Sequence, residues 1–129
     1  MAFKFSKRSL KKMAKVHPDL VAVAKLAINI TAVDFGVTEG HRTLDRQKQL
    51  KAAGASRTLK SRHLIQPDGY AHALDVVAYL NGRVNWSWPL YTQIAKAFKT
   101  AAKKKKVRIT WGGDWKSFRD GPHFQIEVK

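Results

Sequence analysis

The chain has 129 residues and no cysteine, so a single domain over residues 1–129 is expected, without disulfides, thiolate metal sites or cysteine nucleophiles. A 44% hydrophobic content supports a core, but no apolar run is long enough to span a bilayer. The charged start lacks the apolar segment of a Sec signal peptide, so residence in a host cytoplasm is expected. A net charge of +16 predicts attraction to polyanions such as nucleic acid or an anionic cell envelope.

The first half of the chain predicts three helices around one strand. Ser9 can cap a short helix that runs to about residue 15, and Pro18 suits the first turn of a second helix. The apolar stripe of that second helix comprises Leu20, Ala24, Ala27 and Ile28. Asp34–Glu39 resembles a strand, and Thr43 can cap a helix that stops at Gly54.

The second half predicts most of a sheet. Residues 54–72 are expected to be mostly loop, and Ala73–Leu80 a strand that Asn81-Gly82 turns back in a type I′ hairpin. Ser87 can cap a helix that ends in a lysine run, and strands are expected at 107–111 and 122–128. The expected fold class is α+β, a small and mostly antiparallel sheet with helices packed on it.

Three side chains on these elements suggest a metal site. Alternation along the last strand separates His123 from the apolar Phe124, and Asp75 lies on the opposite face of its strand from Leu74, Val76 and Ala78. If the two strands are neighbours, Asp75 and His123 face one space, which His63 can complete. Two imidazoles and one carboxylate with an open fourth position form the ligand set of a catalytic zinc.

A nearby carboxylate would complete the chemistry of such a site. Asp120, three residues before His123, is a candidate general base, and Glu127 is a weaker one because it lies farther along the strand. The competing interpretation is that these histidines and acids are independent surface groups, as most such residues are. Spacing alone leaves both interpretations open.

Three motifs add a family resemblance. Ser61-Arg-His63, Ala71-His-Ala-Leu-Asp75 and Asp120-Gly-Pro-His123 resemble the signature of the VanY-like zinc D-Ala-D-Ala peptidases. Within that family the chain most resembles the phage endolysins that are L-alanyl-D-glutamate endopeptidases. The likeness extends over FKFSKRS at the start, EGHRT at 39–43, ALDVVAYLNGRVNW at 73–86 and WGGDW at 111–115.

The resemblance implies a fold and a set of roles. The fold would be a hedgehog/DD-peptidase-like single domain, and the cofactor would be Zn²⁺. The implied metal ligands are His63, Asp75 and His123, the implied catalytic base is Asp120, and the implied substrate-binding residues are Arg42, Ser61 and Gln47.

The chain departs from the family motif between its first two ligands. Asp75 follows His63 by twelve positions, which is five more than usual, and the extra residues fall around 65–70. The turn-forming Pro67-Asp68-Gly69 would let them loop out. His72 is an alternative ligand to His63, although alternation would point positions 72 and 75 to opposite faces.

Several other residues have two interpretations. Arg42 can bind a substrate carboxylate, or it is an exposed arginine paired with Asp45. Asp114 can orient a ligand histidine, or it is a turn residue that bonds its own backbone. Trp111 and Trp115 can line a cleft or pack in the core.

The expected function is zinc-dependent hydrolysis of the L-Ala–D-Glu bond in peptidoglycan stem peptides, which would make the chain a phage lysis enzyme. The alternatives are a D-Ala-D-Ala carboxypeptidase or dipeptidase on the same fold, a basic binding module for cell wall or nucleic acid, and a cationic membrane disruptor. No nucleic-acid motif is recognisable, so a specific nucleic-acid partner is not expected. The protein is expected to be a monomer. Its basic surface would attract it to the anionic envelope, and it would reach the cell wall from the cytoplasm at lysis.

Overall fold

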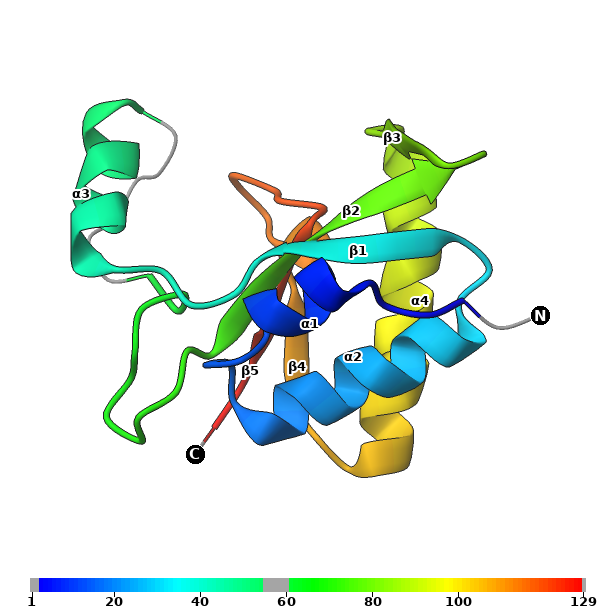
Figure 1. The fold of residues 1–129 in the computed structure, drawn as a ribbon, viewed down its shortest axis with the longest axis horizontal. Coiled ribbons are helices and arrows are strands. Elements are labelled where there is room, and N and C mark those ends of the chain that lie inside the picture. The colour runs from blue at the N-terminus through cyan, green and yellow to red at the C-terminus, as the bar shows by residue number, and fades with distance from the viewer. Residues whose placement is uncertain (1–2, 55–60, 129) are drawn as a thin grey trace.

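The computed structural model describes residues 3–54 and 61–128 (Figure 1). Its elements, in chain order, are α1 (Lys7–Lys12), α2 (Pro18–Ile30), β1 (Asp34–Glu39), α3 (Leu44–Ala52), β2 (Ala73–Leu80), β3 (Arg83–Asn85), α4 (Trp88–Lys105), β4 (Ile109–Trp111), the 3-10 turn η1 (Gly112–Asp114) and β5 (His123–Ile126). The α+β prediction is confirmed. Of the expected loop at 54–72, residues 55–60 lie outside the described part of the chain.

The sheet is antiparallel throughout and is built around β2. Its strand order is β1-β2-β5-β4, and β3 pairs with the far end of β2. In β2 the residues Leu74 and Val76 are buried, and in β5 Phe124 and Ile126 are buried with them. The opposite face of the same two strands therefore carries Asp75 and His123.

Helices α2 and α4 pack against each other and cover the apolar face of the sheet (Figure 1). The predicted stripe of α2 is buried in full, and Tyr91, Ile94 and Phe98 of α4 meet it in the core. Phe98 stacks on Phe124 with a ring-centroid distance of 3.9 Å. The helix α3 stands away from the sheet in Figure 1, at the end where β1 finishes.

Local signals explain most of the element ends. His17 caps α2 through its Nδ1, which accepts a hydrogen bond from the Asp19 N–H at 3.1 Å, and Thr43 caps α3 in the same way. Asn81 and Gly82 both have positive φ angles, 52° and 76°, as a type I′ turn requires. The predicted hairpin is therefore confirmed, and it fixes how β3 returns along β2.

The structure corrects several predicted ends. Helix α1 is capped by Ser6, not Ser9, because the Ser6 hydroxyl accepts the hydrogen bond from the Ser9 N–H. Ser9 is instead buried, and its hydroxyl accepts from the Val37 N–H of β1 at 2.9 Å. Strands β4 and β5 are shorter than expected. β4 begins only at Ile109, because the Val107 N–H still donates to the Ala102 carbonyl at the end of α4, and β5 covers His123–Ile126.

Replacing Ser9 with alanine should lower the free energy of unfolding by about 1–3 kcal/mol, because the buried N–H of Val37 would lose its acceptor. Urea unfolding followed by circular dichroism measures the change. Ser87→Ala is the matched control: Ser87 is an exposed helix cap with no side-chain capping bond, so its change should stay within about 0.5 kcal/mol. Equal effects of the two substitutions would contradict the role given to Ser9.

Candidate metal centre

Strand pairing brings two of the predicted ligands together. In the β2–β5 ladder Asp75 is directly opposite His123, and in the β1–β2 ladder Glu39 is opposite Asp75. The β1 register shifts between Val37 and Glu39, a bulge at the end of the strand nearest Asp75. The sheet therefore places a carboxylate, an imidazole and a second carboxylate side by side.

Backbone hydrogen bonds deliver His63 to the same place. The Arg42 N–H donates to the His63 carbonyl at 2.8 Å, and the His72 N–H donates to the Arg62 carbonyl at 2.8 Å. The His63 ring is buried, and its Nδ1 donates to the Gly40 carbonyl at 2.8 Å. A carbonyl oxygen can only accept, so Nδ1 carries a proton, and Nε2 is the ring atom that faces Asp75.

The three side chains form a compact group of metal-binding atoms. Asp75 Oδ1 lies 3.3 Å from His63 Nε2 and 3.3 Å from His123 Nδ1. One ligand atom from each residue lies within 4.8 Å of the others. Three protein ligands from imidazole and carboxylate match the donor set of a catalytic zinc. The residues present therefore fit such an ion.

The electrostatics of the group favour a charged carboxylate. Burial alone would raise the pKa of Asp75, but hydrogen bonds to His123 and His63 outweigh it and hold the pKa far below its usual range. Burial likewise opposes the charged form of His123, yet Asp75 prevails and raises the pKa of that imidazole. Asp75 is thus an anion at any physiological pH, as a metal ligand must be.

His72 lies apart from this group. Its Nε2 hydrogen-bonds the Asp68 carboxylate at 2.7 Å, and its ring packs edge-on against His17. Asp68 lies in the segment 65–70, where the family resemblance predicts the extra residues, and its carboxylate is directed at His72 and His17 and not at the metal-binding group. The geometry brings His63, and not His72, to Asp75 and His123.

Arg42 is buried beside the group, and the alternative of an exposed arginine paired with Asp45 is wrong. Its guanidinium binds both carboxylate oxygens of Glu39, at 2.7 and 2.9 Å. It also donates to Gln47 at 2.7 Å and to Ser61 at 3.5 Å, and Nη2 lies 3.8 Å from Asp75 Oδ2. Burial alone would raise the pKa of Glu39, but Arg42 outweighs it and lowers that pKa.

The predicted substrate-binding residues thus meet in one network. Gln47 is fully buried behind Arg42, whereas Ser61 is half-buried and its hydroxyl also accepts from the His63 N–H at 3.1 Å. Ser61 therefore connects the Arg42 side chain to the His63 backbone. Glu39 joins the same network through its ion pair with Arg42.

Asp120 lies next to His123 in the turn that precedes β5. Its N–H donates to the Gly112 carbonyl at 3.0 Å, and its own carbonyl accepts from the His123 N–H at 3.2 Å. A Cβ added at Gly112 would lie 3.1 Å from the Cβ of Asp120 and 3.0 Å from that of His123. The two side chains therefore start from the same side of η1. The requirement for glycine at this close approach is a feature that the sequence analysis missed.

The Asp120 carboxyl group has a raised pKa. Burial is the main cause, and the negative charge of Asp75 adds to it, while His123, His63 and Arg42 act in the opposite direction. A carboxyl group with a raised pKa beside metal ligands suits a general base, because proton transfer is most efficient when the pKa approaches the working pH.

Replacing Asp120 with asparagine should raise the melting temperature of the zinc-free protein at pH 7. The pKa of Asp120 is higher in the folded chain than its ordinary value of 3.8, so stability falls as pH rises from that value through the folded pKa. The uncharged amide removes this cost. The gain should therefore shrink as pH is lowered toward 3.8, which thermal unfolding across pH measures. Asp114→Asn, on the exposed carboxylate that pairs with Lys99, should show no such gain.

The remaining aromatic and acidic candidates are divided between core and site. Trp111 is buried, and its indole N–H donates to the Gly121 carbonyl at 2.7 Å, so it packs in the core. Trp115 packs on the His123 ring with a centroid distance of 5.0 Å. Asp114 pairs with Lys99 at 2.7 Å on the surface, and orients neither ligand histidine.

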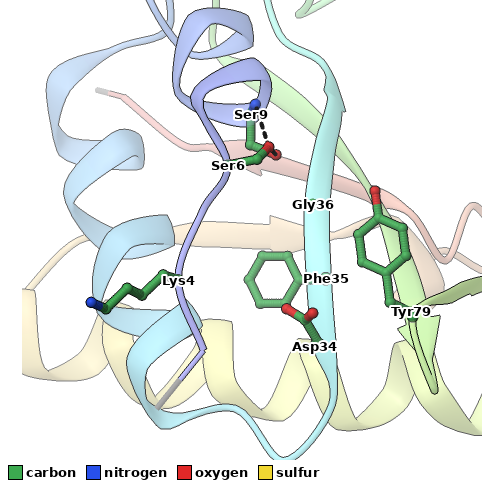
Figure 2. Close-up of a pocket in the computed structure, with 8 residues that line it drawn as sticks. Lys4, Ser6, Ser9, Asp34, Phe35, Gly36 and Tyr79 are labelled. Atoms are coloured by element: carbon green, nitrogen blue, oxygen red, sulfur yellow. Dashed lines mark hydrogen bonds between the residues drawn. The ribbon is translucent and has the colours of Figure 1, made fainter.

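A separate pocket of about 280 Å³ lies at the other end of β1 (Figure 2). It is lined by Lys4, Ser6, Ser9, Asp34, Phe35, Gly36, Tyr79 and Gly82. Asp34 pairs with Tyr79 at this end, whereas Glu39 pairs with Asp75 at the other. The metal-binding group and its neighbours therefore lie outside this pocket.

Comparisons with known proteins agree with this geometry. Residues 1–127 match the family model described as phage L-alanyl-D-glutamate peptidase. The L-alanyl-D-glutamate peptidase of Escherichia phage T5 is 33% identical over 133 aligned positions, which cover 100% of this chain and 91% of that protein. The peptidase of the same name from Listeria phage A118 is 31% identical, over 95% of this chain and 42% of that protein.

A solved structure is also similar. The crystal structure of the Serratia marcescens L-Ala D-Glu endopeptidase ChiX superposes with a TM-score of 0.87 at 44% sequence identity, over 96% of this chain and 90% of that one. Within residues 3–54 and 61–128, no helix has the length and apolar character that a membrane crossing requires. The fold, the sequence and the family model agree, and the chain belongs to the phage L-alanyl-D-glutamate peptidase family.

Proposed function

We propose that this chain is a zinc-dependent endopeptidase that hydrolyses the L-Ala–D-Glu bond of peptidoglycan stem peptides and so lyses the host cell. The observation that carries the proposal is the group of His63, Asp75 and His123, with Asp120 beside it, in a member of this peptidase family. The choice of the L-Ala–D-Glu bond rests on the names of the relatives from phages T5 and A118 and of the Serratia enzyme.

His63 Nε2, His123 Nδ1 and an oxygen of Asp75 would hold the ion. Bound zinc would supply a Lewis acid that polarises the scissile carbonyl and lowers the pKa of water. Asp120 would take a proton from the attacking water and pass it to the leaving amine, and its raised pKa supports both transfers. Each turnover would thus return Asp120 to its starting state.

Arg42 would bind a carboxylate of the stem peptide at the edge of the site. Its guanidinium lies 3.8 Å from Asp75 Oδ2 and is anchored by Glu39, which supports a fixed positive charge next to the reacting group. Ser61 and Gln47 would contribute to substrate binding by holding Arg42 in this orientation. The basic surface would favour encounter with the anionic cell envelope, which a monomer would reach from the host cytoplasm at lysis.

Mass spectrometry of purified Gram-negative peptidoglycan tests the proposal. After incubation with the protein, new N-terminal D-Glu ends should be produced, should disappear with a chelator and should return when zinc is added. Release of terminal D-Ala would instead indicate a carboxypeptidase on the same fold. Unchanged peptidoglycan that still binds the protein in chelator would indicate a non-catalytic wall-binding module.

A further inference from the structure

The polar face of β5 continues beyond His123. Strand alternation places His123, Gln125 and Glu127 on the same face, and each side chain contacts the next one. His123 Nε2 lies 2.8 Å from Gln125 Oε1, and the Gln125 amide nitrogen donates to Glu127 Oε1 at 2.7 Å. All three form one hydrogen-bonded chain that leads away from the metal-binding group.

The donors and acceptors of these three side chains fix the orientation of the Gln125 amide. An ionised glutamate only accepts hydrogen bonds, so the NH₂ group of Gln125 must face Glu127. The carbonyl oxygen of Gln125 then faces His123 and also only accepts, so the hydrogen at their contact belongs to His123 Nε2. Its other nitrogen, Nδ1, lies 3.3 Å from Asp75 Oδ1 and is the atom directed at the metal-binding group.

Glu127 is therefore what orients the amide. Without a partner that only accepts, Gln125 can turn and present its NH₂ group to His123. The ring would then accept at Nε2 and carry its proton on Nδ1, where the proton would occupy the position of a metal ion. Arg62, next to His63 in sequence, lies 3.9 Å from the second carboxylate oxygen of Glu127 and holds this end of the chain.

We propose that Gln125 and Glu127 are positioning residues that hold the His123 ring through its Nε2–H, with Nδ1 directed at the metal-binding group, and so set the zinc affinity of the site. This inference rests on the zinc site of the proposed function. Neither residue touches the reacting atoms, so their effect is on how well His123 binds the metal and in which orientation. Hydrogen-bonded partners of metal-binding histidines typically contribute about 10–100-fold to metal affinity.

The substitutions follow from the same donor and acceptor logic. Gln125→Leu removes the acceptor for His123, and Glu127→Gln removes the group that orients Gln125. The double variant Gln125→Glu with Glu127→Gln reverses the order of the two groups. Its glutamate would accept from His123 Nε2 and from the new amide, so the tautomer is preserved. Gln93→Leu, on an exposed glutamine of α4, is the matched control.

Two measurements on the full chain test the proposal. Competition with a chromophoric chelator gives the zinc dissociation constant, and long-range ¹H–¹⁵N spectra show which ring nitrogen of His123 carries the proton. We expect Gln125→Leu to weaken zinc binding about 10–100-fold and Glu127→Gln to weaken it by less. The double variant and Gln93→Leu should retain the parent affinity, and the parent should carry its proton on Nε2.

The outcomes separate this proposal from the one it rests on. If the parent chain binds no zinc, both proposals fail. If the parent binds zinc but Gln125→Leu and Glu127→Gln bind it equally well, the zinc site stands and the positioning role is overturned. A parent whose His123 Nε2 carries no proton, or a double variant as weak as Gln125→Leu, also overturns it.

Discussion

Replacing Asp120 with asparagine should lower kcat by about 10²–10⁴-fold, the usual contribution of a general acid–base group. The amide keeps the shape of the side chain but cannot accept a proton from the attacking water. Asp120 is not one of the three grouped ligands, so the zinc content should be unchanged. The rate at which new N-terminal D-Glu ends form, measured together with zinc content by elemental mass spectrometry, checks both halves of the prediction.

The matched control for this substitution is Asp114→Asn, six residues earlier and on the surface. It should leave kcat and zinc content at the parent values. A kcat near the parent value in Asp120→Asn would show that another group accepts the proton. Loss of zinc from Asp120→Asn would instead make Asp120 part of the metal site.

Replacing His63 with alanine should abolish stable zinc binding and reduce hydrolysis to background. One of three ligands would be lost, so the affinity should fall by more than the about 10–100-fold expected from losing an outer hydrogen-bonded partner. Dialysis against a dilute chelator followed by elemental mass spectrometry measures retained zinc. Asp75→Ala and His123→Ala should behave in the same way.

His72→Ala is the matched control for the choice of ligand. His72 bonds Asp68 in the inserted loop, so its loss should affect local stability and leave the zinc content intact. The reverse pattern, with zinc retained by His63→Ala and lost by His72→Ala, would overturn the assignment. A loss of zinc in both variants would indicate that the loop bond is needed to place His63.

Local rules predicted the elements of this fold well. The bounds of β1 and β2 agree with expectation, as do Pro18 in the first turn of α2, the cap at Thr43 and the Asn81-Gly82 turn. Each depends on interactions within a few residues, which a sequence pattern records directly. Ser9 was misassigned because Ser6 offers the same capping chemistry, and only the contact with Val37 across the fold distinguishes the two serines.

The residues of the candidate site were predicted individually, but not how they are connected. Alternation in β2 and β5 predicted that Asp75 and His123 would face the same side, and the strand pairing brings them opposite each other. Arg42 was expected either at the surface or on substrate, yet it is buried against Glu39. Glu127 was considered only as a base, and its contact with Gln125 was not anticipated.

The sequence by itself determined the fold class, most of the elements and the residues of the candidate metal site, because periodicity, caps and spaced motifs are local properties of the chain. Only the tertiary structure decided that His63 and not His72 joins Asp75 and His123, and that Arg42 is fixed behind them. The physical reason is that the atoms of such a site come from segments far apart in sequence. Their distances depend on strand register and on backbone hydrogen bonds between loops, such as that from Arg42 to His63, which no local pattern specifies.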